Sequence, residues 1–411
     1  GQTTALNDIL RNFYGFSTAS DNVSGVLEIR PVVTNQSGDP TANTGRVTFA
    51  SSRTYADTPS GTYGQFVPAI PYSDFIARGS VLSLQQIAKS ANYRTNIGLV
   101  EAAGEAATVR ITLFNERGQR INEFTRELLP GQQTQFPLDT AVENGRLEVA
   151  VIAGEGRVTA YASVLDNKTA DPLLVMPVVP AGVRAARWIL PGIADLNTGS
   201  ASWRSDVRLF NAGTAPVNAT LLYYPRNEPG NPRTITRTIQ PGQVEVIDSA
   251  LQSLYSRTND AGSLVVTTPA DAQLVASART YNDTGNGTYG QFIPGITVGE
   301  GVGLGQRALQ ILQVEESDRF RTNVGIVELT GNPVQVEIGA TSPDSRVSVR
   351  VPITLQGNQF LQKDRILAEL GMGTTYNARI TLRVIGGTGR ISGYASLIDN
   401  RTQDPTYVPA Q

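Results

Sequence analysis

Alternating apolar and polar residues run through most of the chain, and this pattern predicts β-strands. Residues 109–114 (VRITLF), 146–152 (RLEVAVI) and 379–385 (RITLRVI) are rich in β-branched residues and are followed within two positions by Gly or Asn. Further strands of this kind are expected at 207–210, 219–224 and 263–267. Helical patterns are few and short, at 6–14, 250–255 and 365–370. The chain is therefore predicted to be all-β, with its helices as connectors at the ends of β-sandwiches.

The chain also repeats itself over a long distance. Three motifs occur twice, each with copies between 226 and 233 residues apart. They are GTYGQF at 61 and 287, Arg-Thr-Asn at 94 and 321, and Asp-Asn-x-Thr-x-Asp-Pro at 166 and 399. One long unit therefore occurs almost twice, which is typical of a duplicated architecture.

The long unit divides again into two related modules. Residues 203–207 (WRSDV) resemble 93–97 (YRTNI) and 320–324 (FRTNV), and each segment opens a similar succession of strands and turns. The spacing gives modules of about 110 residues with roughly seven strands, which is the size of an Ig-like β-sandwich. Modules of the first kind close with GTYGQF, and those of the second kind close with Asp-Asn-x-Thr-x-Asp-Pro.

Boundaries between modules are expected in segments rich in Gly and Pro. They define an incomplete β-sandwich module at 1–75 and complete modules at 76–182, 183–298 and 299–411. Because the linkers are short, we expect a semi-rigid rod of tandem Ig-like modules of two alternating types.

The first module lacks its beginning. Residues 6–14 match 250–255 and residues 25–29 match 262–266, but nothing in the first module corresponds to 189–246. A sandwich without these strands would expose two edges and half of its core. Three hypotheses remain open: the sequence is a fragment of a longer repeat protein, another chain supplies the strands, or the module folds differently.

Composition excludes several classes of function. Lys and Arg number 34 against 36 Asp and Glu, so the net charge of −2 gives no footprint for nucleic acid. The chain has no Cys and no His, which removes disulfides, thiolate metal sites and the commonest general base. No apolar run is long enough for a transmembrane helix. The polar start at 1–9 lacks a signal peptide, so we expect a mature form, a fragment or a cytoplasmic protein.

Two loops rich in oxygen ligands are candidates for binding Ca²⁺. The hard cation takes six to eight oxygens, and closely spaced Asp and Asn side chains supply several of them. The candidate ligands are Asp166, Asn167, Asp171, Asp399, Asn400 and Asp404. The alternative is that these side chains cap a turn by bonding to their own backbone, and the loops lack the spacing of an EF-hand.

The GTYGQF segments carry aromatic residues in polar surroundings. Such side chains are candidates for stacking on a sugar or for contact with another subunit. The candidates are Tyr63, Phe66, Tyr289 and Phe292. The alternative is a hairpin whose glycines satisfy turn geometry and whose aromatic rings return to the core.

Three arginines begin equivalent strands, and no enzymatic motif accompanies them. Arg94, Arg204 and Arg321 each follow an aromatic residue, and pairing within their own module is favoured over binding a carboxylate ligand. The Gly-rich segment 299–306 (GEGVGLGQ) is not followed by a helical pattern, so it does not qualify as a phosphate-binding loop. We find no nucleophile with its base and no carboxylate pair, and therefore do not expect an enzyme.

Three segments carry a resemblance to known proteins. Residues 94–101 (RTNIGLVE), 321–329 (RTNVGIVEL) and 394–410 (YASLIDNRTQDPTYVPA) resemble tandem Ig-like β-sandwich repeats in secreted or surface proteins of GC-rich bacteria, acidobacteria-like lineages among them. The resemblance covers nearly the whole chain and implies an extracellular β-sandwich protein without known catalytic residues. Residues 203–206 and the GTYGQF closures depart from it.

These observations favour a structural function. The first hypothesis is an extracellular subunit of a cell-surface filament or layer, a homo-oligomer or polymer assembled through β-sandwich modules and strand complementation between subunits. The alternative is a cell-surface adhesin or carbohydrate-binding protein with a glycan or protein ligand at the Tyr-bearing segments. A hydrolase would need carboxylates brought together between modules.

Overall fold

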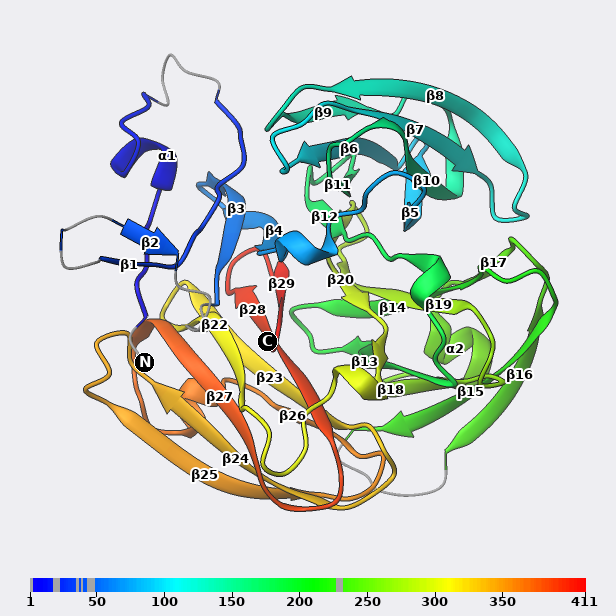
Figure 1. The fold of residues 1–411 in the computed structure, drawn as a ribbon. Coiled ribbons are helices and arrows are strands. Elements are labelled where there is room, and N and C mark those ends of the chain that lie inside the picture. Colours follow the sequence, from blue (N-terminus) through cyan, green and yellow to red (C-terminus); the bar gives the residue numbers. More distant parts are fainter. Residues whose placement is uncertain (1–2, 18–22, 35–36, 38–39, 43–48, 227–231) are drawn as a thin grey trace.

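A computed structural model describes the whole chain except residues 1–2, 18–22, 35–36, 38–39, 43–48 and 227–231. The described part is all-β, built from antiparallel sheets with three short α-helices, which confirms the predicted fold class. The strands expected from the alternating pattern are present, for example β7 (Ala107–Phe114) and β27 (Thr375–Gly387). The strands group into three sandwich-like units and an N-terminal segment (Figure 1).

The unit at 76–182 consists of two four-stranded sheets. One sheet has the order β5–β10–β7–β8 and the other β12–β11–β6–β9. The remaining bounds are β5 (Val81–Lys89), β6 (Tyr93–Glu101), β8 (Arg120–Leu128), β9 (Gln133–Pro137), β10 (Val142–Gly154), β11 (Val158–Asp166) and β12 (Pro172–Val175). Side chains from both sheets, such as Leu84, Ile97 and Val109, are fully buried in one core.

The unit at 299–411 repeats this topology strand for strand. Its sheets have the orders β22–β27–β24–β25 and β26–β23–β28–β29. The bounds are β22 (Leu309–Glu316), β23 (Phe320–Glu328), β24 (Val334–Thr341), β25 (Ser348–Leu355), β26 (Phe360–Lys363), α3 (Ile366–Glu369), β28 (Ile391–Asp399) and β29 (Pro405–Pro409). Equal strand orders in two units are the structural counterpart of the sequence duplication.

The unit at 183–298 differs because strand β13 (Arg187–Asn197) contributes to both of its layers. The order is β16–β15–β18–β13–β14–β19–β20, with β17 beside β14 and β21 beside β13. The bounds are β14 (Ser202–Asn211), β15 (Val217–Pro225), β16 (Arg233–Ile239), β17 (Val244–Ile247), α2 (Ala250–Tyr255), β18 (Asp260–Thr267), β19 (Leu274–Asp283), β20 (Thr288–Pro294) and β21 (Ile296–Thr297). Gly192, with a φ of +74°, lies at a register shift where β13 passes from one layer to the other.

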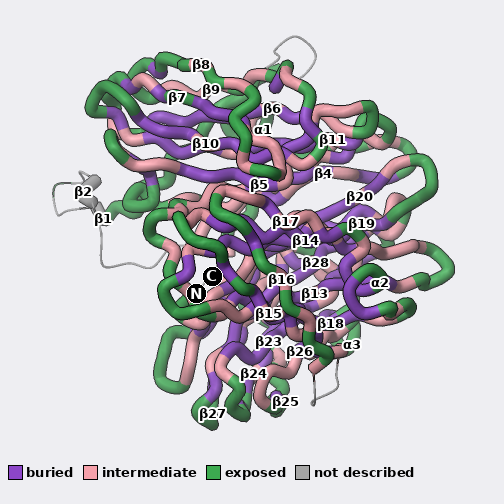
Figure 2. Tube along the Cα trace, turned by 90° about the vertical axis from the view of Figure 1, so that its right-hand side faces the viewer, coloured by how far each residue is buried: buried purple, intermediate pink, exposed green. Residues whose placement is uncertain are grey.

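The N-terminal segment contains α1 (Ile9–Asn12), β1 (Val32–Thr34), β2 (Pro40–Ala42) and the hairpin of β3 (Ser51–Thr58) and β4 (Gly61–Pro68). α1, β1 and β2 lie to one side of the three units (Figure 1). Buried residues follow the strands of the three units, whereas no residue of α1 is buried (Figure 2). The connecting 3-10 turns are η1 (Tyr72–Asp74), η2 (Pro180–Gly182) and η3 (Val298–Glu300). The β3–β4 hairpin, in contrast to α1, β1 and β2, is hydrogen-bonded to the last unit of the chain.

The expected rod is wrong, because the chain closes on itself. The backbone N–H of Thr62 in β4 donates to Asp399 in the last unit, 337 residues away. The first and last parts of a rod could not meet in this way, so the units surround a common centre (Figure 1). The strands of the three units fall within 76–182, 183–298 and 299–411, and as domain boundaries these limits stay a prediction.

The units also contact one another directly. The Arg146 guanidinium lies between the rings of Phe114 and Phe210, 4.3 and 4.2 Å from their centroids, and so joins the units at 76–182 and 183–298. The core at 183–298 continues into the last unit through Phe360 and Tyr394. No described helix is long and apolar enough to cross a membrane.

Candidate functional site

Both copies of GTYGQF are strands that bind a loop of another unit. β20 contacts the loop between β11 and β12, and β4 contacts the loop between β28 and β29. We call the first contact the β20 junction, formed by Thr288 and Gly290 with Asp166, Thr169 and Asp171. We call the second the β4 junction, formed by Thr62 and Gly64 with Asp399, Thr402 and Asp404. The two duplicated motifs are therefore partners of each other.

In the β20 junction, the Asp166 carboxylate is the central acceptor. Its Oδ2 accepts from the N–H and the hydroxyl of Thr288, both at 2.9 Å, and its Oδ1 accepts from two amides of its own loop. The Thr169 hydroxyl donates to the Thr288 carbonyl at 2.8 Å. Oδ2 of Asp171 accepts from the Gly290 N–H at 2.7 Å. Charged acceptors make these bonds stronger than neutral ones.

The β4 junction reproduces this arrangement bond for bond. Oδ2 of Asp399 accepts from the N–H and the hydroxyl of Thr62, at 2.8 and 2.7 Å, while Oδ1 accepts from two amides of its own loop. The Thr402 hydroxyl donates to the Thr62 carbonyl at 2.7 Å, and Oδ2 of Asp404 accepts from the Gly64 N–H at 3.0 Å. The hairpin of the N-terminal segment thus binds the last unit as β20 binds the unit at 76–182.

The geometry explains the glycine that opens GTYGQF. Gly61 and Gly287 have φ values of +121° and +104°, a region that residues with a side chain rarely adopt. A Cβ on Gly61 would lie 2.8 Å from Oδ1 of Asp399, and a Cβ on Gly287 would lie 2.9 Å from Oδ1 of Asp166. Glycine is therefore needed both for the backbone and for the close approach of the carboxylate.

A partly buried arginine accompanies each junction. Arg279 lies 4.5 Å from the ring centroid of Tyr281 and 5.0 Å from that of Tyr93, whose hydroxyl accepts from Nη1 at 2.8 Å. Arg53 occupies the equivalent place over Phe320 and Tyr55, and burial lowers its pKa. Neither arginine was predicted from the sequence. The signal was present, because SSRTYADT precedes the first GTYGQF and SARTYNDT the second.

The two outer aspartates are held in the ionised state. Burial opposes ionisation of Asp166, but amide and hydroxyl donors, including those of Thr288, outweigh it and lower its pKa. The same balance, with donors from Thr62, lowers the pKa of Asp399. Ionised Asp166 and Asp399 are therefore part of the folded junctions at neutral pH.

The two inner aspartates behave in the opposite way. Asp171 and Asp404 are 4% and 0% exposed, and Oδ1 of each accepts no hydrogen bond from the described residues. Burial raises the pKa of Asp404 to about 7, although the Arg53 guanidinium opposes this rise. Burial, followed by the charge of Asp404, raises the pKa of Asp171 well above its usual value. The centre of the molecule thus holds two carboxyl groups that disfavour each other's ionisation.

The predicted aromatic contact residues lie in these strands. The rings of Tyr63 and Tyr289 are 6.4 Å apart and both residues are partly exposed, so the two GTYGQF copies meet there. Phe66 is 8% exposed and belongs to the core of the last unit, and Phe292 packs against the core of the unit at 76–182. The rings therefore enter the cores of other units of the same chain. Contact with a ligand or another subunit stays a prediction.

The remaining candidate residues stabilise their own units. Nη1 of Arg94 donates to Asn167 at 3.0 Å, and Nη1 of Arg321 donates to Asn400 at 2.9 Å. Arg204 is 3.4 Å from Asp195. Pairing within the module, the favoured hypothesis for these arginines, is confirmed.

The candidate Ca²⁺ ligands also have protein partners. The carboxylates of Asp166 and Asp399 already accept N–H and O–H groups, which a cation would have to replace. In the part of the chain that the structure describes, no three acidic side chains gather as a metal site. Calcium binding stays a prediction.

Fold and junctions define an all-β protein of sandwich-like units joined through aspartate acceptors and the backbone of a Gly-Thr-x-Gly strand. A family model described as a family of unknown function (DUF5719) matches residues 82–357. This range is more than half of the chain, and the chain therefore belongs to that family. No curated protein and no solved structure matches the chain.

Proposed function

We propose that the protein is an extracellular structural subunit of a cell-surface filament or layer, built from Ig-like modules and assembled through its incomplete N-terminal module. One observation carries the proposal. α1 and the β3–β4 hairpin of the N-terminal segment are the counterparts of α2 and the β19–β20 hairpin, yet several apolar side chains of this segment are exposed.

α1 and the residues after it correspond to α2 and the residues after it in the unit at 183–298. Asp8 before α1 and Ser249 before α2 both have left-handed backbones, with φ values of 49° and 45°. Phe13 and Tyr14 are 63% and 51% exposed, whereas Tyr255 at the equivalent of Tyr14 is 5% exposed. α1 and α2 therefore begin with the same backbone conformation, but only α2 is followed by an aromatic side chain that is buried in a core.

The segment after α1 shows the same contrast. Leu27 is 45% exposed and Ile29 is 52% exposed, while their counterparts Leu264 and Val266 in β18 are 1% and 0% exposed. Burying an aliphatic side chain of this size stabilises by about 1.5–3 kcal/mol. Several exposed apolar side chains on one segment are typical of an interaction surface. Here the interaction surface consists of Phe13, Tyr14, Leu27 and Ile29. We propose that this surface is covered in the assembly.

Cross-linking in the producing cell tests the proposal. We expect the chain in large cross-linked species that protease added outside the cell can reach. Leu27→Asp with Ile29→Asp should return it to the size of one chain, because two charges on the interaction surface oppose burial. Val347→Asp with Ile385→Asp is the matched control, since these side chains are similarly exposed, at 49% and 42%, on a complete unit. An intracellular chain, or one that is never cross-linked, contradicts the proposal.

A second candidate is a surface adhesin or carbohydrate-binding protein. Tyr63 and Tyr289 favour it, because two partly exposed rings 6.4 Å apart are suited to stacking on a sugar. Binding to a glycan array that is lost in Tyr63→Ala with Tyr289→Ala would support it. An array without any bound glycan would remove it.

A further inference from the structure

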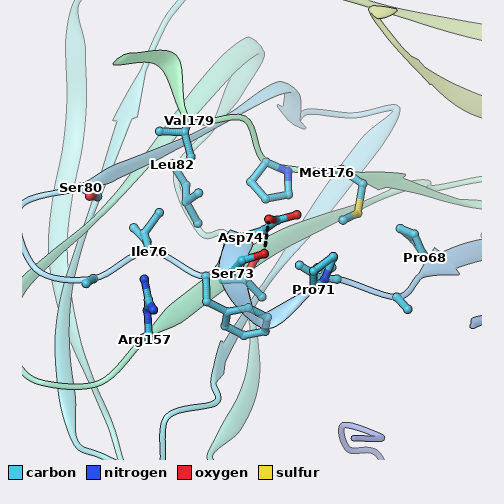
Figure 3. Close-up of a pocket in the computed structure, with 16 residues that line it drawn as sticks. Pro68, Pro71, Ser73, Asp74, Ile76, Ser80, Leu82, Arg157, Met176 and Val179 are labelled. Carbon is cyan, nitrogen blue, oxygen red and sulfur yellow. Dashed lines mark hydrogen bonds between the residues drawn. The ribbon is translucent and has the colours of Figure 1, made fainter. Parts of the chain in front are cut away.

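A groove of about 660 Å³ lies between the connector after β4 and the unit at 76–182 (Figure 3). Its floor is apolar, because the lining residues Phe75, Ile76 and Leu82 are 8%, 6% and 2% exposed. Among the described residues that line the groove, Arg157 alone carries a positive charge. We propose that the groove binds a monocarboxylate with an apolar chain, and that the Arg157 guanidinium binds its carboxylate.

Arg390 occupies the equivalent backbone position in the last unit. The backbone N–H of Arg157 donates to the Glu101 carboxylate at 3.1 Å. The backbone N–H of Arg390 donates to the Glu328 carboxylate at 3.3 Å. In both units the residue after the arginine also forms a β-bridge with the preceding connector. The two side chains therefore start from equivalent positions, and their partners can be compared directly.

The partners of the two guanidinium groups differ. Nε and Nη2 of Arg390 donate to the carbonyls of Val298 and Gly301 in the connector. Nε of Arg157 is buried and has no acceptor among the described residues. Tyr72 stands where the last connector has Val298, and its ring centroid lies 5.3 Å from the Arg157 guanidinium. Stacking on a ring uses the face of a guanidinium and leaves the N–H groups at its edge available to an acceptor.

A carboxylate is the acceptor that suits this edge. Its two oxygens fit two parallel N–H groups of a guanidinium, and such charge-assisted bonds are strong. In the last unit two carbonyl oxygens serve the Arg390 guanidinium in this way. The bound ligand would thus supply to Arg157 what the connector supplies to Arg390.

The rest of the groove requires an apolar chain on the ligand. Besides the floor, the lining includes Pro68, Pro71, Met176 and Val179. Figure 3 shows Arg157 at a distance from Pro68 and Met176, so a chain bound at the guanidinium can extend along the apolar lining. The volume lies within the range of about 300–1,000 Å³ that is typical of small-molecule sites.

Asp74 favours a ligand with one carboxylate over a ligand with two. It lines the groove, is exposed, and accepts from the Ser73 hydroxyl at 3.0 Å. A second carboxylate at the far end of the ligand would meet apolar walls and the charge of Asp74. Both are unfavourable for an anion, so we infer a monocarboxylate.

Isothermal titration calorimetry of the full chain with octanoate tests the proposal. We expect saturable binding of one octanoate per chain. From hexanoate to decanoate, the affinity should rise about fourfold for each methylene group that enters the groove. Octan-1-ol, which lacks the charge, and octanedioate, which carries a second one, should each bind at least about tenfold more weakly than octanoate.

Variants locate the binding in the groove. Arg157→Gln should weaken octanoate binding at least about tenfold and leave octan-1-ol binding unchanged, which also shows that the groove is still formed. Val179→Asp keeps Arg157 but places a charge on a side chain of the groove that is 37% exposed, and should weaken the binding of both ligands. Arg117→Gln is the matched control, because this arginine of the same unit is 77% exposed and does not line the groove. It should change nothing.

Three results would overturn the proposal. Octan-1-ol or octanedioate that binds as tightly as octanoate would show that the groove does not select a monocarboxylate. Octanoate binding that Arg157→Gln leaves unchanged would place the ligand elsewhere on the protein. No binding at octanoate concentrations up to about 10 mM would remove the site altogether. None of these measurements depends on assembly at the cell surface, so this proposal and the proposed function are tested separately.

Discussion

Replacing Asp166 with alanine should destabilise the unit at 183–298 by about 3–5 kcal/mol. The change removes the acceptor of the Thr288 N–H and hydroxyl and of two loop amides. The N–H and hydroxyl of Thr288 are buried, and a buried donor without an acceptor costs about 1–3 kcal/mol. β20 would then be attached to the unit at 76–182 only through the bonds of Thr169 and Asp171 and the packing of Phe292.

Tryptophan fluorescence during denaturant unfolding measures this effect. The chain has two tryptophans, Trp188 and Trp203, and both belong to the unit that β20 completes. The midpoint of their transition should fall in Asp166→Ala. Because several units unfold in this chain, the midpoint reports this unit and not the whole protein.

Asp399→Ala is the matched control. It removes the same set of hydrogen bonds from the β4 junction, which contains no tryptophan. The tryptophan transition should remain near that of the unchanged protein, while limited proteolysis should release the β3–β4 hairpin. Equal tryptophan midpoints in Asp166→Ala and the unchanged protein would contradict the role assigned to the junction.

Local sequence patterns were sufficient to predict the strands but not the contacts between strands and loops of different units. Strand identity depends on neighbours within a few residues, so the runs at 109–114 and 379–385 were recognised and are confirmed. The bond between Thr62 and Asp399 depends on residues 337 positions apart, and no periodicity encodes it. Short linkers therefore suggested a rod, although the two GTYGQF strands close the chain around a centre.

The sequence drew attention to the aspartates of the two junctions but left their chemistry undetermined. Asp166 and Asp399 attracted attention because they offer oxygen atoms, and both a cation and an N–H group seek oxygen. Whether a cation or an N–H group approaches these carboxylates depends on a strand from another unit. Nothing in the Asp-Asn-x-Thr-x-Asp-Pro loop itself names GTYGQF as its partner, except that both occur twice at nearly the same spacing.

Asp404 should make the β4 junction weaker as the pH rises. Burial raises the pKa of its carboxyl from 3.8 to about 7, so the folded junction keeps a proton that the unfolded chain releases. This contribution is fully present below about pH 4 and is lost as the pH rises through 7. Asp399, with a lowered pKa, acts oppositely and loses its contribution as the pH falls below 3.8. The junction should be most stable near pH 4–5.

Asp404→Asn should remove the loss at high pH. The amide oxygen can still accept from the Gly64 N–H, and the side chain no longer ionises beside Asp171 and Asp399. At pH 8 we expect the variant junction to be more stable by on the order of 2–4 kcal/mol, with little difference at pH 4.5. The Arg53 guanidinium favours the ionised form of Asp404 and so reduces the expected difference. The lower end of the range, about 2 kcal/mol, is therefore the smallest difference in stability that supports the prediction.

Amide hydrogen exchange of residues 61–66 provides the measurement, with the variant and the unchanged protein compared at the same pH so that intrinsic exchange rates cancel. At pH 8 the protection factors of these amides should be at least about thirtyfold larger in Asp404→Asn than in the unchanged protein, which corresponds to a stability difference of about 2 kcal/mol. Asp139→Asn, an exposed carboxyl on the unit at 76–182, should change nothing. If Asp404→Asn and the unchanged protein lose protection equally between pH 4.5 and 8, ionisation of Asp404 is not what weakens the junction. Replacement of Asp171, the other buried carboxyl with a raised pKa, by asparagine should then restore protection instead.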